Sequence, residues 1–417
     1  MTTIVGVLNK RAVAIAADSA VTVGDTHKVM NTGNKIFSLS KYAPVGIAIY
    51  GNASLMETPW EVIIKNYRRQ LSHTKFNHLR DYVNDFIKFL KKNSFFASPI
   101  IQRSHLAFQM NSFYIICENE AKKRDSYLID PTQAIIDELN DCKQKNKISV
   151  DIFSDFKKYT YTSFVNFAKD VLKDVIKKSS YLQVDKHFDD FAESYYYYMR
   201  VAHIRRNGES GLVFVGYGED EIYPSLYNLI TTIGFDKKFQ YCPGESPIEI
   251  SNEKLSASIV PFAQVEATQT VIRGINPTFY DIISFNFTTI LGGFRKVICD
   301  VLRNNNQDSL ASQIESVDIT PFTTTFNQVT QNEFKNNYTQ PLVNTISHLG
   351  LSDMANVAES LVALTSLVHR MSPKEESVGG PVDVAVISKG DGLIWIKRKH
   401  YFTPDLNTQF FNNYNAD

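Results

Sequence analysis

The sequence contains few cysteines for its length, and its histidines do not cluster. Four cysteines occur among 417 residues, far apart and without metal-ligand spacing: Cys117, Cys142, Cys242 and Cys299. The nine histidines form no H-x-x-x-H motif and no Cys/His cluster. Because a chain of this length can bury a sizeable apolar core without disulfides, we expect reduced cysteines and no metal site.

An excess of one charge and a long apolar run are also missing. The chain has 44 basic and 44 acidic residues, so its net charge of 0 gives no basic surface for nucleic acid. No early segment combines a basic start, an apolar core and a cleavage site, and no apolar run reaches about 18 residues. We therefore expect a cytoplasmic protein that neither crosses a membrane nor binds nucleic acid.

The start of the chain carries the most informative pattern. Thr2 and Thr3 open an apolar run that continues to Val7. A threonine hydroxyl needs a neighbouring base to become a nucleophile, and an amino-terminal threonine has one in its own α-amino group, whose reference pKa is about 7.7 to 8.0. The small residue after Met1 favours removal of that methionine, which would place Thr2 at the terminus. The alternative interpretation is that Thr2 only begins an edge strand.

Three further residues, in order along the chain, fit this chemistry. Asp18 follows a second apolar run, Lys35 precedes Ile36, and Gly51 ends a third run. A lysine ammonium near the α-amine would lower the pKa of that amine, and an aspartate would keep the lysine charged. A glycine allows a backbone N–H to approach the oxyanion of a tetrahedral intermediate.

With these residues the chain resembles the β-type proteasome subunits and their bacterial relatives, which are threonine peptidases of the amino-terminal nucleophile hydrolase superfamily. The resemblance implies that Thr2 is the nucleophile, with Asp18, Lys35 and the oxyanion glycine Gly51 as catalytic partners, and that Thr22 contacts the substrate backbone. Other matching segments are Leu212–Asp220 with Tyr223–Tyr227, and Gly379–Ile387.

The chain departs from the family pattern at residues that help to orient the terminal amine. No Gly-Ser-Gly turn occurs near Gln264, and Glu375 and Val378 stand where the family has aspartate and serine. Either Gln264 or Glu375 could take over the orienting role, or Glu375 is an exposed loop residue. A catalytically degenerate site is a further alternative.

The resemblance implies an α+β fold, a four-layer αββα sandwich of this superfamily, which uses about half of the chain. We therefore expect a large helical insertion at residues 95–207 between the two halves of the core, 2–94 and 208–417. The insertion could cap the cleft or mediate assembly. Its tyrosine run, 195–198, is expected to be core and rim packing rather than a binding surface.

Apolar spacing predicts individual elements. Helices are expected around residues 55–67, 79–90, 265–273 and 352–368, followed by a hairpin of strands at 382–387 and 393–396. Two weaker signals predict a short hairpin from 113–117 and 127–129, and loop with irregular helix at 304–344.

The function implied by the resemblance is hydrolysis of peptide bonds through an acyl-enzyme on Thr2, without a cofactor. The expected partners are peptide or unfolded protein substrates and identical copies of the chain in a homo-oligomer. Two alternatives stay open: a noncatalytic proteasome-like scaffold, and an amidohydrolase that acts on a small amide rather than on peptides.

Overall fold

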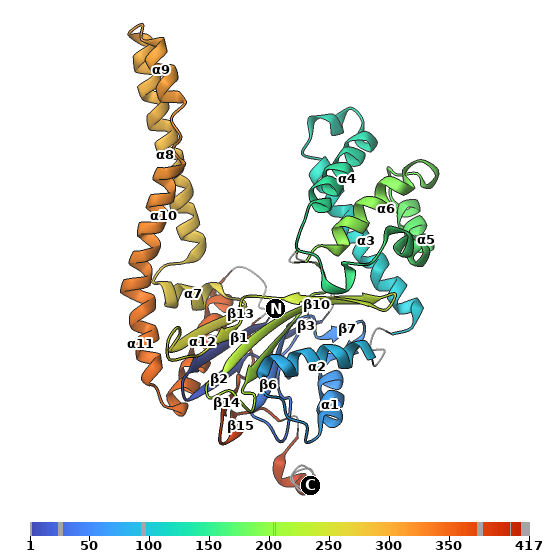
Figure 1. The fold of residues 1–417 in the computed structure, drawn as a ribbon, viewed down its shortest axis with the longest axis vertical. Coiled ribbons are helices and arrows are strands. Elements are labelled where there is room, and N and C mark those ends of the chain that lie inside the picture. Colours follow the sequence, from blue (N-terminus) through green and yellow to red (C-terminus); the bar gives the residue numbers. More distant parts are fainter. Residues whose placement is uncertain are drawn as a thin grey trace. The chain divides into compact units, whose positions relative to one another are not determined.

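The structure of the protein is a computed structural model that describes residues 2–23, 28–92, 97–202, 204, 206–372, 378–400 and 402–409. The chain is mixed α+β, and its principal strand pairs are antiparallel (Figure 1). Its residues group into two compact units. The first comprises Met1–Gly33, Ile250–Val386 and Trp395–Asp417, and the second comprises Asn34–Glu249 and Ile387–Ile394.

The first sheet has the strand order β13-β1-β2-β14-β15. Strand β1 lies inside this sheet, and all seven of its residues are buried. Its β-branched and small side chains suit a strand that is covered on both faces. The strands are β13 (Ala257–Ala263), β1 (Thr3–Asn9), β2 (Ala12–Ala17), β14 (Asp383–Ser388) and β15 (Gly392–Lys397).

Helices of the first unit pack on this sheet. Helix α12 (Leu351–Met371) contacts β1 and β2, and α11 (Gln340–His348) contacts β13 and β1. The shared core contains Val5, Val7, Ala14, Met354, Ala358 and Val362. The predicted C-terminal helix and the hairpin after it are therefore confirmed, as β14 and β15 follow α12.

The second sheet has the order β11-β10-β9-β6-β5, with β12 (Ile248–Glu249) paired to β10. Helices α1 (Trp60–Leu71) and α2 (Leu79–Lys92) contact it, as the apolar spacing predicts. Phe86 of α2 meets Phe214 of β9 edge-on at 5.5 Å between ring centroids. The strands are β5 (Ile36–Ser38), β6 (Val45–Gly51), β9 (Ser210–Gly216), β10 (Ser225–Phe235) and β11 (Lys238–Pro243).

Four helices of the second unit form what we call the aromatic bundle, residues 99–200. They are α3 (Pro99–Ala121), α4 (Pro131–Lys147), α5 (Tyr161–Lys178) and α6 (Val184–Arg200), with short 3-10 turns η2 (Asp125–Leu128) and η3 (Ser154–Phe156). The predicted hairpin at 113–117 and 127–129 is wrong, because α3 and η2 occupy these residues. A run of apolar residues fits a buried helix as well as a strand.

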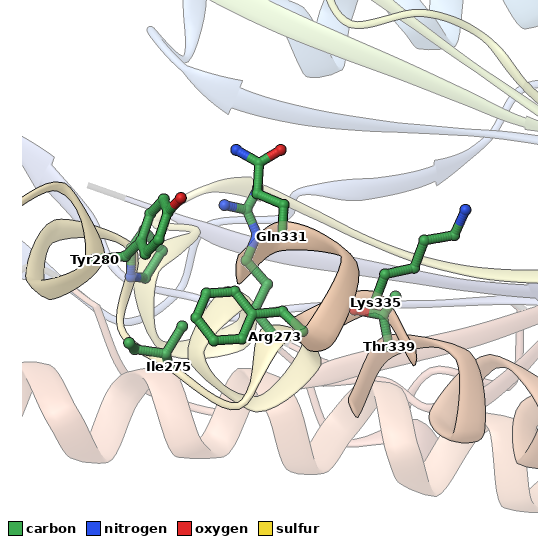
Figure 2. Close-up of a pocket in the computed structure, with 8 residues that line it drawn as sticks. Arg273, Ile275, Tyr280, Gln331, Lys335 and Thr339 are labelled. Carbon is green, nitrogen blue, oxygen red and sulfur yellow. The ribbon is translucent and has the colours of Figure 1, made fainter. Parts of the chain in front are cut away.

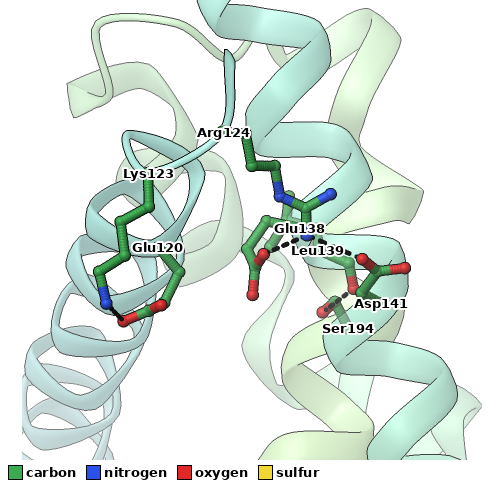
Figure 3. A network of polar contacts seen from close by, with 7 residues as sticks. All are labelled: Glu120, Lys123, Arg124, Glu138, Leu139, Asp141 and Ser194. Carbon is green, nitrogen blue, oxygen red and sulfur yellow. Dashed lines mark hydrogen bonds and ion pairs between the residues drawn. The ribbon is translucent and has the colours of Figure 1, made fainter. Parts of the chain in front are cut away.

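The bundle is held by rings in its core and by ion pairs at its surface. Three members of the tyrosine run on α6 are buried, so the run is packing: Tyr195, Tyr196 and Tyr198. At the surface, Arg124 pairs with Glu138 and Asp141 of α4 (Figure 3). Ser194 of α6 donates a buried hydrogen bond of 2.7 Å to the Leu139 carbonyl of α4.

A second helical region belongs to the first unit. Helix α7 (Glu266–Arg273) ends at Gly274 with a left-handed φ of 73°, which confirms the predicted helix and its glycine stop. We call residues 277–339 the helical arm. It contains α8 (Pro277–Asn304), α9 (Asp308–Glu315), α10 (Thr320–Phe334) and the π-helix η4 (Lys335–Thr339).

The expectation at 304–344 is loop with irregular helix. Only its loop part is wrong, because the helices α9 and α10 and the π-helix η4 fill most of this stretch. Its threonines and asparagines are weak helix formers, but apolar residues recur at helical spacing. Phe326 of α10 stacks on Phe287 of α8 at 4.2 Å, so tertiary packing outweighs the weak local propensity. Figure 1 shows α8 and α10 running side by side.

Helix α8 is also long and apolar enough, by length and composition alone, to cross a membrane. It is mostly exposed, and the length and composition of one helix are weak evidence for a membrane span.

Candidate active site

Thr2 and Thr3 are held at the start of β1 by the strand that pairs with it. Thr2 is 6% exposed, and its carbonyl accepts a hydrogen bond of 3.3 Å from the Gln264 N–H. The Thr3 hydroxyl donates to the Gln264 carbonyl, also at 3.3 Å. Gln264 therefore contacts the chain start through its backbone, a contact that residue type alone could not predict.

Asp18 follows β2 and lies opposite the start of β1, because Ile4 pairs with Ala17. Its carboxylate is buried, and Oδ1 accepts a hydrogen bond of 2.9 Å from the Thr3 N–H. Oδ2 accepts from the N–H groups of Gly379 at 3.1 Å and Ala20 at 3.3 Å. Asp18 thus fixes the residue next to Thr2 through the backbone.

The glycine pair Gly379-Gly380, which is distant from Asp18 in the sequence, also contacts the segment around Asp18. The Gly379 carbonyl accepts hydrogen bonds from the N–H groups of Ser19 and Ala20, at 3.1 and 3.0 Å. Gly380 has a φ of 76°, and a Cβ there would lie 2.9 Å from the Cβ of Asn31. The left-handed conformation and the close contact both favour glycine. Thr3, Asp18 and Gly379 therefore form one connected backbone cluster.

One strained residue lies beside the chain start. Ala263 ends β13, pairs with Thr3 and has a φ of 66°. Non-glycine residues rarely adopt this conformation, and strained backbone is enriched at functional sites. The sequence carries no signal for this feature, because alanine has no preference for positive φ.

Two other predicted residues belong to the second unit. Lys35 is buried just before β5, and its carbonyl accepts a hydrogen bond of 2.9 Å from the Ile49 N–H of β6. Gly51 ends β6 with a φ of 78°, and a Cβ there would meet the Glu209 carbonyl oxygen at 2.4 Å. Pairing of β5 with β6 thus brings Lys35 near the end of the strand that carries Gly51.

The remaining predicted residues are described partly or not at all. Thr22 lies in β3 (Val21–Val23), where it pairs with Val29 of β4 (Lys28–Met30), but its side chain is outside the described part of the chain. Glu375 lies outside the described residues. Val378, which stands in place of a serine, is buried.

This arrangement can perform nucleophilic chemistry only if the amine of Thr2 is free. With Met1 removed, the amine and the hydroxyl of Thr2 would belong to one residue, which satisfies the geometric need for a base next to the nucleophile. Asp18 and Gly379 would then act by holding the backbone, not by contacting substrate. Within the described residues, no group of three or more His, Cys, Asp or Glu side chains could hold a metal ion.

A separate pocket of about 250 Å³ lies at the base of the helical arm. None of the predicted site residues lines it, and its described lining includes two cations but no carboxylate (Figure 2). The pocket therefore suits an anion better than a cation. Its lining residues are Arg273, Ile275, Pro277, Tyr280, Gln331, Phe334, Lys335 and Thr339.

No protein-family model matches the chain, and a search of curated proteins finds no match.

Proposed function

We propose that this chain is a proteasome-like amino-terminal threonine hydrolase that cleaves peptide bonds. The observation that carries the proposal is the backbone cluster at the chain start, in which the buried Asp18 carboxylate accepts the Thr3 N–H at 2.9 Å. The residue next to the proposed nucleophile is thus held in place by a buried hydrogen bond, which supports the preorganisation that catalysis needs.

The proposal includes a four-layer αββα sandwich. Its support is that each antiparallel sheet has helices of its own unit on it, α11 and α12 in the first and α1 and α2 in the second. Strands β1 and β9 are buried along their whole length, which means that other parts of the protein cover both faces of each strand. Packing the two sheets face to face would supply that cover.

The proposed reaction begins after Met1 is removed. The Thr2 amine takes the hydroxyl proton while Oγ1 attacks the scissile carbonyl carbon, and the Gly51 N–H stabilises the oxyanion. The C–N bond then breaks, the leaving amine takes the proton, and an acyl ester stays on Thr2. Water hydrolyses this ester and regenerates the hydroxyl. Lys35 would lower the pKa of the amine by like-charge repulsion.

Peptides or unfolded protein segments are the proposed substrates, without a cofactor, in a cytoplasmic homo-oligomer. Neither nucleic acid nor a membrane is a proposed partner. If small amides are hydrolysed and peptides are not, the amidohydrolase alternative replaces peptidase activity.

The experiment is hydrolysis of a fluorogenic peptide library by the wild type, Thr2→Ala and Thr2→Ser. We expect Thr2→Ala to lose all hydrolysis, while Thr2→Ser keeps a measurable part because it retains a hydroxyl and an amine. Thermal unfolding of both variants should match that of the wild type. Full activity in folded Thr2→Ala would refute the proposal, and a wild type that retains Met1 and lacks activity would favour the scaffold alternative.

A further inference from the structure

The helical arm leaves most of its apolar side chains uncovered. Helix α8 has 28 residues, of which only Cys299 is buried among those described, and α10 has no buried residue. The contact between α8 and α10 uses one face of each helix. Tyr280 and Ser284 of α8 donate hydrogen bonds to the Asn327 side-chain oxygen of α10, at 2.9 and 2.8 Å.

Six of the exposed apolar residues of α8 form a stripe along the helix. They are separated by 3, 4 or 8 positions, intervals that return to the same side of an α-helix. We call this set the α8 stripe: Phe279, Ile282, Ile290, Phe294, Val297 and Val301, each exposed over about half of its surface or more. Phe285 is 70% exposed but lies outside the stripe, roughly 130° around the helix axis from its centre.

The stripe is large enough to form a stable interface. Its two phenylalanines can each bury about 150–250 Å² and its four aliphatic side chains somewhat less, and about half or more of each is exposed, so the six side chains offer on the order of 600 Å² per chain. The largest apolar patch of a typical monomer is about 300–600 Å². Two such stripes facing each other would bury roughly 1,200 Å², which reaches the range of specific protein interfaces.

A glycine beside the stripe indicates that a helix approaches closely. Gly293 lies in the interior of α8, where glycine costs about 1 kcal/mol relative to alanine. A Cβ at this position would meet nothing within 4 Å, so packing inside the chain does not require glycine. A glycine on a helix surface lets another backbone come near, as small residues do between packed helices.

The charges of α8 favour a second copy of this chain over a lipid surface. The helix has three cations, Arg295, Lys296 and Arg303, against the anions Asp281 and Asp300, so its net charge is 3 − 2 = +1. Helices that lie on membranes usually carry many basic residues on the polar face. Residues 282–294 are uncharged, so the centre of the stripe would meet an identical stripe without charge repulsion.

We propose that two copies of the chain associate through their α8 stripes, antiparallel and around a two-fold axis. Ile290 is the midpoint between Phe279 and Val301, so an antiparallel pair centred there buries both stripes over their full length. A two-fold contact uses the same patch on both copies, which one self-complementary stripe can provide. Ile290 and Gly293 of each copy would then lie close to the axis. This proposal does not depend on catalysis at Thr2.

The first test is sedimentation equilibrium of the full chain over a wide concentration range. We expect the wild type to self-associate and the double variant Phe294→Ser, Val297→Ser to weaken that association at least tenfold. Phe285→Ser is the matched control, because it removes an exposed phenylalanine from the same helix outside the stripe, and it should leave association unchanged. Equal effects of stripe and control variants, or a wild type that stays monomeric, would overturn the proposal.

The second test probes the geometry. An Ile290→Cys variant should form an intermolecular disulfide under mild oxidation, because the two copies of this residue would meet at the axis, whereas Phe285→Cys should not. Absence of the Ile290→Cys cross-link in an associated protein would refute the antiparallel arrangement. A monomeric wild type that co-sediments with phosphatidylcholine vesicles would assign the stripe to lipid instead.

Discussion

The aromatic bundle and the helical arm are both helical and rich in phenylalanine, but they differ in where their apolar faces are covered. In the bundle, Phe113, Phe164 and Phe191 are buried inside the second unit. In the arm, Phe285 and Phe294 are exposed although the helix that carries them, α8, is fully formed. The comparison shows that a helical apolar pattern specifies a face to be covered without specifying whether the cover belongs to the same chain.

The largest expected effect is a difference in the free energy of unfolding between a substitution in the bundle and one in the arm. Phe113→Ala should destabilise the protein by about 3–5 kcal/mol, because it opens a cavity among packed rings. Phe322→Ala, at an exposed site of α10, should change the free energy of unfolding by less than about 0.5 kcal/mol in the monomer. Urea unfolding at low protein concentration measures both. Similar losses for the two variants would show that the arm is packed as tightly as the bundle.

The second prediction concerns Lys35, the proposed catalytic lysine, which belongs to the second unit. Lys35→Ala should lower turnover by on the order of 10², the scale of a lost acid–base partner, with an unchanged fold. Lys10→Ala changes an exposed lysine of the first unit and should leave turnover near the wild-type value. Peptide hydrolysis under identical conditions gives the comparison, and equal rates for the two variants would remove Lys35 from the proposed site.

A third prediction concerns the backbone cluster formed by Thr3, Asp18 and Gly379. Asp18→Asn keeps the size of the side chain but replaces one acceptor oxygen by an amide nitrogen, so a buried backbone N–H loses its partner. We expect a loss of about 1–3 kcal/mol in the free energy of unfolding. Urea unfolding tests this, with Asp137→Asn on the bundle surface as control. Unchanged stability of Asp18→Asn would mean that the backbone cluster does not hold the chain start.

The smallest expected effect concerns the reactivity of two cysteine thiols inside the aromatic bundle. A hydrogen bond from Cys117 lowers the pKa of the Cys142 thiol, although burial acts in the opposite direction. The same hydrogen bond and burial raise the pKa of Cys117. Near neutral pH, Cys142 should therefore carry more thiolate and react with iodoacetamide several times faster than Cys117.

Time-resolved mass spectrometry of the alkylated peptides measures these rates. Cys117→Ala should slow alkylation of Cys142 because the hydrogen bond is lost. If Cys142 and Cys117 react at the same rate in the wild type, the proposed effect of their contact is wrong.

The sequence predicts the elements whose signal is local. Helices α1, α2, α7 and α12 and the hairpin β14–β15 follow from apolar spacing, glycine stops and proline positions. The hairpin predicted at 113–117 and 127–129 is wrong because apolar runs do not separate buried helix from strand. At 304–344 only the loop part of the expectation is wrong, because packing overrides weak helix propensity.

The contacts of the candidate site depend on pairing across long stretches of sequence. Asp18 and Gly379 are separated by 361 positions, and only the glycine pair gave a sequence signal for their contact. The backbone contacts of Gln264 and the strained φ of Ala263 follow from the register of β13 against β1, which no residue type encodes. In the same way, Cys117 and Cys142 meet only because α3 packs on α4.

The most direct test of the central claim is the site at which a threonine-directed covalent inhibitor attaches to the mature protein. Intact-mass measurement followed by peptide mapping identifies both the first residue and the modified one. We predict a chain that lacks Met1 and carries a single adduct on Thr2. A chain that retains Met1, or an adduct at any residue other than Thr2, would contradict the account.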